Sequence, residues 1–400
     1  MHETITIQLG QCGNQIGNDF WSKIEEEHLN NVETRDRRDK FFYSSERGKM
    51  TPRTILIDTE PRAINQNISN YRNTFLTNEG TGASNNWAHG FSLAKTHSEE
   101  ILELIVRNIE ACDNVESIQM IHSCAGGTGS GFSSFLCESL RDMFPKKIFY
   151  DFAIMPNNNE ASDVVVQPYN TILNLNKIKE YSDAVILMDN FALAKQTDLS
   201  LKKIHSYENI NSVAADVISS FSSSIRFPNF MYTENKSIVN TLVPERNFNL
   251  IVPGIIATRH REYNVSEIVN NLIKQKVMLC NYENSSIYGS TAVWNVLESN
   301  LDVNAIARSQ RLVQNKINFL GVPYYSTAMT NRRTVNVSYN NSTCIRSVLR
   351  KVIDQYEKLQ QRNAFLGIYQ KFGLEVEEMN GAKENIKGLV EGYETLEMKK

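Results

Sequence analysis

The sequence lacks the features that mark several classes of protein. Its 400 residues include only six cysteines and no CxxC pair, so we expect free thiols in a reducing compartment rather than a zinc ribbon or a disulfide framework. No apolar run approaches the roughly 18 residues of a membrane span, since the longest candidate, 248–257, contains Pro253 and Gly254. The first residues show no basic-then-apolar signal pattern, so we expect a cytoplasmic protein.

An excess of charge of one sign is also missing. The chain has 42 Lys+Arg against 45 Asp+Glu, a formal net charge of -3. This balance argues against binding driven by bulk charge, so we expect neither a nucleic-acid nor a membrane partner. The seven histidines form no cluster with metal-ligand spacing. The length predicts roughly two to three domains.

What is present, over the first 190 residues, is an alternation of short apolar strands with helical patterns. The strands are expected at 5–9, 54–58, 117–123, 148–155 and 183–189. The helices between the later strands are expected at 92–110, 131–144 and 168–179. This alternation predicts an α/β fold with a doubly wound, mostly parallel sheet, whose ligand crevice lies at the carboxyl ends of the strands.

The rest of the chain follows a different pattern. Apolar residues at helical spacing predict a central helix over 208–225. Mixed strands and helices then continue to about residue 340, and two late helices follow, from 349 to about 369 and over 380–398. We therefore expect a first domain over 1–206, a central helix with a smaller α/β domain over 207–345, and a C-terminal helical layer over 346–400.

The densest chemical signal is the run AGGTGSG at 125–131, which follows an expected strand and precedes a helix expected to start near Phe132. Glycines let the backbone approach a phosphate, and the N–H groups at a helix start hold the anion. The run lacks the GKS or GKT of a P-loop, and its GxGxG spacing does not fit the GxGxxG dinucleotide fingerprint. It predicts a phosphate site, with a glycine-rich turn that binds nothing as the alternative.

Three further loops point to the same kind of ligand. A glycine turn at 10–13 follows the first strand, and a polar loop at 81–86 suits a terminal phosphate. Asp58 and Glu60 come directly after another strand. Carboxylates beside a polyphosphate commonly hold Mg²⁺ or orient a water molecule, although a solvated acidic turn is the plainer interpretation.

These four loops, in this order and at these separations, resemble those of the tubulin superfamily. Residues 125–131 match the tubulin signature loop, and GQCGNQIG at 10–17 matches the N-terminal loop. The resemblance extends over essentially the whole chain and is closest to γ-tubulin. The runs that carry the γ-like character are 39–43, NNWA at 85–88, Gln167 before Pro-Tyr-Asn, and RNAFL at 362–366. Because the last residues read EMKK, we expect no acidic C-terminal tail, which would also depart from α- and β-tubulin.

The resemblance implies that the chain binds GTP or GDP with Mg²⁺. The nucleotide-binding residues that it implies are Gln11, Cys12, Asp58, Glu60, Asn85, Ser123, Gly126, Gly127, Thr128, Gly129, Asp163, Gln167, Tyr207 and Asn211.

The implied roles of these residues differ. Asp58 and Glu60 would lie at the γ-phosphate and Mg²⁺, and Asn85 would reach the γ-phosphate. Asp163 and Gln167 fall at the ribose loop. Tyr207 would stack on guanine, and Asn211 would hydrogen-bond its edge, since i and i+4 share one helix face.

The function implied by the resemblance is a GTP-binding structural protein that templates microtubule nucleation at a microtubule organising centre, either a spindle pole body or a centrosome. Its partners would be γ-tubulin complex proteins, the α-tubulin of the αβ dimer, and lateral neighbours of its own kind. Two alternatives stay open. A polymerising α- or β-type tubulin GTPase is disfavoured by the γ-like runs, and a metabolic enzyme with a dinucleotide site by the missing fingerprint.

Departures from the family pattern limit the expected activity. Ala194 stands where tubulins place a nucleotide-contacting Asn, and Ser237 stands where α-tubulin has the Glu that activates hydrolysis on the next subunit. We therefore expect no catalytic residue and at most a slow GTPase that needs a docked partner. Segments 20–41, 257–265 and 328–342 look short for the family, which predicts weaker self-assembly.

Three side chains near the loops have plain interpretations. We expect His122 to be a packed or supporting histidine rather than a catalytic base. Cys12 and Cys124 are expected to be small packing residues, because no base lies beside either of them in the sequence.

Overall fold

The structure is a computed structural model of the chain. It describes residues 2–30, 36–44, 50–64, 73–77, 82–156, 164–197, 206–228, 232–257, 264–282, 288–297, 303–314, 324–328 and 335–398. The chain forms two compact units. The first consists of Met1–Asn18, Asp39–Val185 and Leu349–Val390, and the second of Asp19–Arg38, Ile186–Val348 and Glu391–Lys400.

The first unit is built on parallel strands in the order β7-β6-β1-β4-β5. They are β1 (Glu3–Leu9), β4 (Thr54–Asp58), β5 (Thr74–Leu76), β6 (Val115–Ser123) and β7 (Ile148–Met155). Ile7 of β1 pairs with Ile55 on one side and Met120 on the other. β1 and β4 are buried along their whole length, as expected for strands covered on both faces by helices. β8 (Ala184–Asp189) leads from this unit into the second, and β2 (Phe42–Ser44) pairs with β3 (Met50–Pro52) as a separate hairpin.

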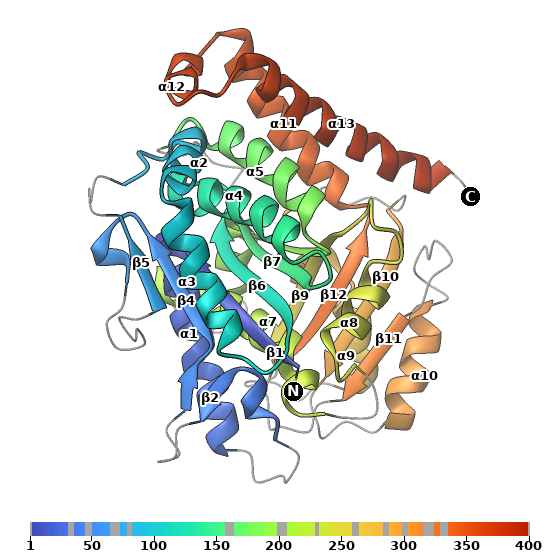
Figure 1. Ribbon diagram of the computed structural model, residues 1–400. Helices are drawn as coiled ribbons and strands as arrows, with labels where there is room; N and C mark the ends of the chain where they lie inside the picture. Colours follow the sequence, from blue (N-terminus) through green and yellow to red (C-terminus); the bar gives the residue numbers. More distant parts are fainter. Residues whose placement is uncertain are drawn as a thin grey trace. The chain divides into compact units, whose positions relative to one another are not determined.

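Helices cover both faces of this sheet. Helices α2 (Trp87–Thr96), α4 (Gly127–Met143) and α5 (Gln167–Tyr181) lie side by side over one face, and α3 (Ser98–Glu110) follows α2 (Figure 1). The first turns of α1 (Gly10–Asn30) pack on the other face, where Gly13 lies against the Ile121 carbonyl and Gly17 against the Gln8 side chain. Each close approach leaves no space for a Cβ atom.

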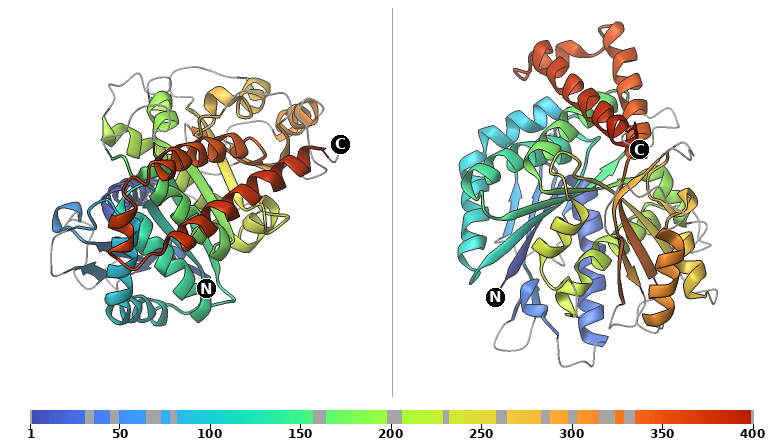
Figure 2. Two further views of the ribbon diagram at one scale, coloured as in Figure 1. Left: turned by 90° about the horizontal axis from the view of Figure 1, so that it is seen from above. Right: turned by 90° about the vertical axis from the view of Figure 1, so that its right-hand side faces the viewer.

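A C-terminal helical layer belongs mostly to the first unit, which includes its residues 349–390. It consists of α11 (Ile345–Gln361), α12 (Leu366–Gln370) and α13 (Val376–Met398), and the hairpin of α11 and α13 can be followed in both views of Figure 2. The Tyr356 hydroxyl donates to the Met379 carbonyl at 3.0 Å, which joins the two long helices. The ring of Tyr169 on α5 packs edge-on against Tyr356 and Tyr369, with centroids 4.8 and 5.5 Å away. Aromatic packing thus attaches this layer to α5.

The second unit has a smaller mixed sheet in the order β11-β10-β12-β9. Its strands are β9 (Leu250–Ala257), β10 (Ser290–Leu297), β11 (Tyr324–Ala328) and β12 (Val335–Ser342), and β12 is antiparallel to both neighbours. Its helices are α6 (Asn190–Gln196), α7 (Tyr207–Arg226), α8 (Asn235–Leu242), α9 (Val265–Asn271) and α10 (Val303–Gln314). The Tyr339 hydroxyl of β12 donates to the Val217 carbonyl at 2.6 Å, which fixes the sheet to the central helix α7.

These findings confirm the predicted fold class: an α/β protein with a large, mostly parallel sheet, a central helix and a C-terminal helical layer. Three helices differ from the prediction. The helix expected over 92–110 is two helices divided at His97, whose ψ of 20° leaves the helical range. The late helix expected from 349 to about 369 is also two, α11 and α12. Helix α4 begins at Gly127 and not near Phe132, because tertiary contacts hold its glycines in helical turns.

None of the helices in the described ranges has the length and apolar character that crossing a membrane requires.

Candidate functional site

The two glycine-rich turns meet in the first unit, where β1 and β6 end. Gly10 begins α1 directly after β1 and has a φ of 70°, a value that glycine adopts readily. A Cβ atom on Gly10 would lie 3.0 Å from the backbone nitrogen of Gly129 in α4. The starts of α1 and α4 are therefore in close backbone contact. Because both helix starts present N–H groups and a positive dipole end, they can hold one anionic ligand between them.

The acidic loop after β4, residues 58–60, makes short contacts with the start of α4 and with Gly82. The hydroxyls of Thr59 and Thr128 lie 2.7 Å apart, which connects the loop to the first turn of α4. On its other side, a Cβ atom on Gly82 would lie 2.6 Å from a carboxylate oxygen of Glu60. The Gly82–Asn86 loop therefore lies directly beside Glu60.

Helices α2 and α4 touch through their main chains. A Cβ atom on Gly127 would lie 2.7 Å from both the Ala83 carbonyl oxygen and the Asn86 nitrogen. One on Gly131 would lie 2.5 Å from the Phe91 nitrogen, and one on Gly90 would lie closer still to the Gly127 carbonyl oxygen. These contacts complete the assembly of all four sequence-predicted loops in one place.

The Gly82–Asn86 loop has an unusual backbone. Ser84 and Asn85 are both exposed and both have positive φ values, 49° and 52°. Such left-handed residues cost of order 1–3 kcal/mol each, less for Asn than for most residues, and persist only where the surroundings fix them. Asn86 then caps α2, since its side-chain oxygen accepts hydrogen bonds from the Ala88 and His89 nitrogens at 2.9 and 3.4 Å. The loop is thus held firmly at its helical end.

Asp58 and Glu60 have contrasting environments. Asp58 is buried, and burial raises its pKa from 3.8 to about 6, although the Thr59 N–H and the Asn14 amide donate to its carboxylate at 2.7 and 3.1 Å. Glu60 is exposed. In the described part of the chain no group of three or more His, Cys, Asp or Glu gathers at a metal-binding distance. Two carboxylates fit Mg²⁺ that shares its coordination with phosphate and water rather than a cage made of protein alone.

The cysteines and histidine near the loops do not provide a nucleophile or a base. Burial raises the pKa of the Cys12 thiol to about 12 and raises that of Cys124 further, so both stay protonated at neutral pH. His122 is fully buried, with its Nε2 atom 3.1 Å from Asp151, whose other oxygen accepts from the Ser182 hydroxyl. This matches the packed histidine expected from the sequence.

The first unit brings together the predicted phosphate-binding residues Gln11, Cys12, Asp58, Glu60, Asn85, Ser123, Gly126, Gly127, Thr128 and Gly129. Gln167 is the first residue of α5 in the same unit. Asp163 lies outside the described residues, as do parts of the three segments expected to be short, 31–35, 258–263 and 329–334.

The predicted guanine-binding residues belong to the second unit. Tyr207 and Asn211 lie one turn apart at the start of α7, which the Ser206 hydroxyl caps by accepting from the Asn209 nitrogen. The Tyr207 side chain is 79% exposed and therefore available to stack on a planar ligand. Ala194 lies on α6, and the nearby Gln196 amide already donates to the Lys276 carbonyl at 2.5 Å. Gln196 is thus engaged within its own unit.

The sequence predicted no role for Asn170, whose side chain hydrogen-bonds to two of the loops. Its amide nitrogen donates to the carbonyls of Asn85 and Ala125, both at 2.8 Å. The only signal in the sequence was its place in the Pro-Tyr-Asn run of the tubulin resemblance, which says nothing about these partners.

A comparison with known protein families bears on the same part of the chain. Residues 3–198 match the family described as Tubulin/FtsZ family, GTPase domain. The matched range contains β1, β4, β6 and all four loops, and this domain implies binding of a guanine nucleotide. The match covers residues 3–198 of the 400-residue chain and supports a tubulin-like GTP-binding protein.

Proposed function

We propose that the four loops bind the phosphates of GTP or GDP, and that the protein templates microtubule nucleation as a γ-tubulin-like subunit. The observation that carries the nucleotide site is the convergence of the loops, shown by the approach of Gly10 to Gly129 and of Thr59 to Thr128. The N–H groups of the first turn of α4 would hold the phosphates, together with Gln11 and Cys12 at the start of α1. Asn85 would contact the γ-phosphate.

Mg²⁺ fits this proposal as an ion held jointly by nucleotide and protein. Asp58 and Glu60 would bind it directly or through water, and the bound ion would neutralise phosphate charge. A divalent cation favours the charged form of a carboxylate, so it would offset the burial that raises the Asp58 pKa. Gln167 and Asp163 would lie near the ribose. Tyr207 would stack on guanine while Asn211 hydrogen-bonds its edge.

The chain is proposed to be at most a slow GTPase. Position 237, where α-tubulin carries its hydrolysis-activating Glu, is an exposed serine on α8. A serine hydroxyl does not act as a carboxylate base near neutral pH. Hydrolysis of the chain's own GTP would then require an α-tubulin docked above it. This substitution disfavours a polymerising tubulin of the α type.

The proposed mechanism is templating. Association costs translational and rotational entropy, and this cost is the main barrier to starting a polymer. A ring of these subunits, held by γ-tubulin complex proteins and lateral contacts, would present GTP-loaded faces to α-tubulin and so lower that barrier. The protein would act in the cytoplasm and cytoskeleton, at a microtubule organising centre or spindle pole.

The nucleotide site is tested by the affinity of the purified protein for GTP. We expect Asp58→Ala to lower the affinity roughly tenfold or more, because the variant loses about one charge-assisted contact with the ligand. Asp142→Ala is the matched control, because Asp142 is an exposed carboxylate near the far end of α4 and should leave the affinity unchanged. Unchanged affinity in Asp58→Ala would refute the site.

The nucleating role is tested by the lag time of αβ-tubulin assembly. The protein assembled with γ-tubulin complex proteins should shorten the lag, whereas the protein alone at low micromolar concentration should form no filaments. Filaments of the protein alone would favour the polymerising alternative. Steady turnover of GTP by the isolated protein at 1 s⁻¹ or faster, a rate typical of ordinary enzymes, would contradict the need for a docked partner.

A further inference from the structure

The Asn170 side chain uses its whole hydrogen-bonding capacity in the first unit. Its amide nitrogen donates to the Asn85 and Ala125 carbonyls. Its oxygen accepts from the Trp87 nitrogen at 2.9 Å and from the Tyr369 hydroxyl at 2.6 Å. An amide offers two donors and two acceptor sites, so a fully buried Asn170 with four partners is completely satisfied. Such a residue is fixed in one orientation.

The four partners come from three stretches that are far apart in the sequence, since only Asn85 and Trp87 are near neighbours. Asn85 belongs to the loop proposed for the γ-phosphate, Ala125 to the signature loop, Trp87 to the start of α2, and Tyr369 to α12. A second connection runs beside the first, because the Asn86 side-chain nitrogen donates to the Ile368 carbonyl at 3.1 Å. Two hydrogen-bonded routes therefore join the Gly82–Asn86 loop to α12.

The backbone of that loop explains why it needs such support. Ser84 and Asn85 both lie in the left-handed region although neither is glycine. A conformation of this kind persists only when neighbouring groups fix it. Asn170 fixes the backbone carbonyl of Asn85 by donating a hydrogen bond to it. The direction in which Asn85 presents its amide thus depends on Asn170, and the orientation of Asn170 depends in turn on Tyr369.

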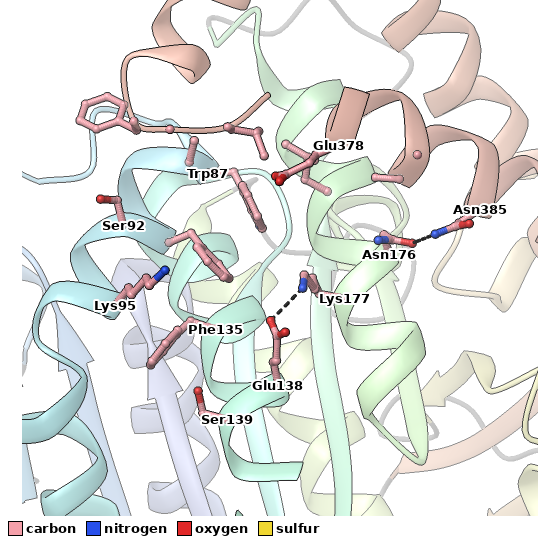
Figure 3. A pocket seen from close by; sticks show the side chains of 18 residues that line it. Trp87, Ser92, Lys95, Phe135, Glu138, Ser139, Asn176, Lys177, Glu378 and Asn385 are labelled. Atoms are coloured by element: carbon pink, nitrogen blue, oxygen red, sulfur yellow. Dashed lines mark hydrogen bonds and ion pairs between the residues drawn. The ribbon is translucent and has the colours of Figure 1, made fainter. Parts of the chain in front are cut away.

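Besides these bonds, the His89 ring of α2 stacks on Phe372 of the C-terminal layer, with centroids 4.1 Å apart. A groove of about 850 Å³ lies beside this contact, lined by α2, α4, α5, α13 and residues 372–374 (Figure 3). Trp87 lies at this groove, and one hydrogen bond drawn across it joins Asn176 to Asn385 at 3.0 Å (Figure 3). That pair is exposed to solvent, so it contributes little. The buried bonds of Asn170 and Asn86 are therefore the better candidates to connect the loop with α12.

We propose that Asn170, oriented by Tyr369, is a positioning residue that holds the Gly82–Asn86 loop ready for the terminal phosphate of GTP and couples occupancy of that position to α12. The inference rests on the proposed function, because it needs Asn85 to contact the γ-phosphate. Coupling of this kind is reciprocal: if the attachment of α12 favours GTP, then GTP tightens the attachment of α12. GDP lacks the terminal phosphate and does not have this effect.

The first test compares two variants that each lose one buried hydroxyl. Tyr369→Phe removes the donor to Asn170 and keeps the ring that packs against Tyr169. Tyr356→Phe is the matched control, because its hydroxyl donates to Met379 within the C-terminal hairpin. We expect Tyr369→Phe to weaken binding of a non-hydrolysable GTP analogue by about two- to tenfold, the equivalent of one hydrogen bond, and to leave GDP affinity unchanged. Tyr356→Phe should leave the ratio of the two affinities as in the wild type.

The second measurement needs no variant. Amide hydrogen exchange of residues 366–370 in the wild-type protein should be slower with the GTP analogue bound than with GDP bound. In Tyr369→Phe this difference should shrink.

The outcomes separate the inference from the function on which it rests. If neither nucleotide binds the wild-type protein, the proposed function fails. If both bind but Tyr369→Phe lowers both affinities equally, or exchange in 366–370 is the same with either nucleotide, the inference is overturned and the nucleotide site stands.

Discussion

Asn170 in the first unit and Arg226 in the second are both completely buried polar side chains, but they are satisfied in different ways. Asn170 is neutral and hydrogen-bonds to loop carbonyls, a loop nitrogen and one hydroxyl. Arg226 is charged and forms a 2.7 Å ion pair with Glu27 of α1, with further bonds to Ser222 and the Ser219 carbonyl of its own helix. A neutral amide has little charge to desolvate, so it suits loops that are proposed to bind a nucleotide. A buried charge requires its partner at all times, so it suits a permanent helix–helix attachment.

The largest effect is expected at the charged pair. Arg226→Met should lower the free energy of unfolding by about 3 kcal/mol or more, because it leaves Glu27 without its cation in a largely buried place. Urea denaturation measures the loss, and nucleotide affinity per folded molecule should stay the same. The double variant Arg226→Met/Glu27→Gln has no unpaired charge and should recover much of the stability. If the single and double variants were equally stable, Arg226 would not act as a charged attachment.

The next largest effect on the free energy of unfolding is expected at Asp58. Replacing this residue should raise the stability, whereas replacing Arg226 should lower it. The pKa of Asp58 is raised by burial, so the folded protein binds more protons than the unfolded chain between about pH 4 and pH 6. The stability linked to this group is fully present below the unfolded pKa and is lost as the pH rises through about 6. At pH 7.5 the charged Asp58 therefore costs about 2–3 kcal/mol, converted at 1.36 kcal/mol per pKa unit.

Asp58→Asn should consequently make the nucleotide-free protein more stable at pH 7.5, by up to that amount, and should change its stability little at pH 4. Urea titrations at the two pH values measure the difference. The same variant should bind GTP with Mg²⁺ more weakly, because the carboxylate is lost. Asp142→Asn is the control and should change neither property. Equal effects of Asp58→Asn at both pH values would show that its raised pKa does not limit stability.

The smallest effects on the free energy of unfolding are expected at two adjacent glycines, Gly126 and Gly127. Substitution of one should disturb packing, and substitution of the other should disturb nucleotide binding. A Cβ atom on Gly127 would press on backbone atoms of Ala83 and Asn86, so Gly127→Ala should cost about 1–3 kcal/mol of stability. A Cβ atom on Gly126 would meet nothing within 4 Å, and its φ of -77° suits alanine. Gly126→Ala should therefore stay within about 0.5 kcal/mol of the wild type. Its added methyl lies beside the start of α4, so we expect weaker GTP binding from a protein of normal stability.

Thermal unfolding and GTP titration of the two alanine variants make this distinction measurable. A loss of stability in Gly126→Ala equal to that in Gly127→Ala would contradict the close packing described for α2 and α4. Normal GTP affinity in a stable Gly126→Ala would place the phosphates elsewhere.

The sequence predicted the strands β1, β4, β6, β7 and β8 well, because they are short, buried apolar runs with sharp ends, whereas the three-residue strands β2, β3 and β5 were not predicted. The expected strands at 54–58 and 148–155 coincide with β4 and β7. The start of α4 was misplaced because four nearby glycines usually indicate a loop, whereas here backbone contacts with α2 hold them in helical turns. Asn170 was missed for a related reason. Its partners lie 45 to 199 residues away, and no local pattern encodes such pairings.

The main-chain contact between α2 and α4 also has a consequence for how this chain can vary. Most helix pairs adjust to a mutation by changing rotamers, since side chains lie between their backbones. Here Gly90, Gly127 and Gly131 leave no side chain to adjust, so even the smallest addition separates the two helices. Saturation mutagenesis should therefore find that alanine already lowers stability at these three positions and that larger residues lower it further, while exposed positions on the same helices accept most residues. The phosphate loops would then keep their geometry over long divergence while the surface around them changes freely.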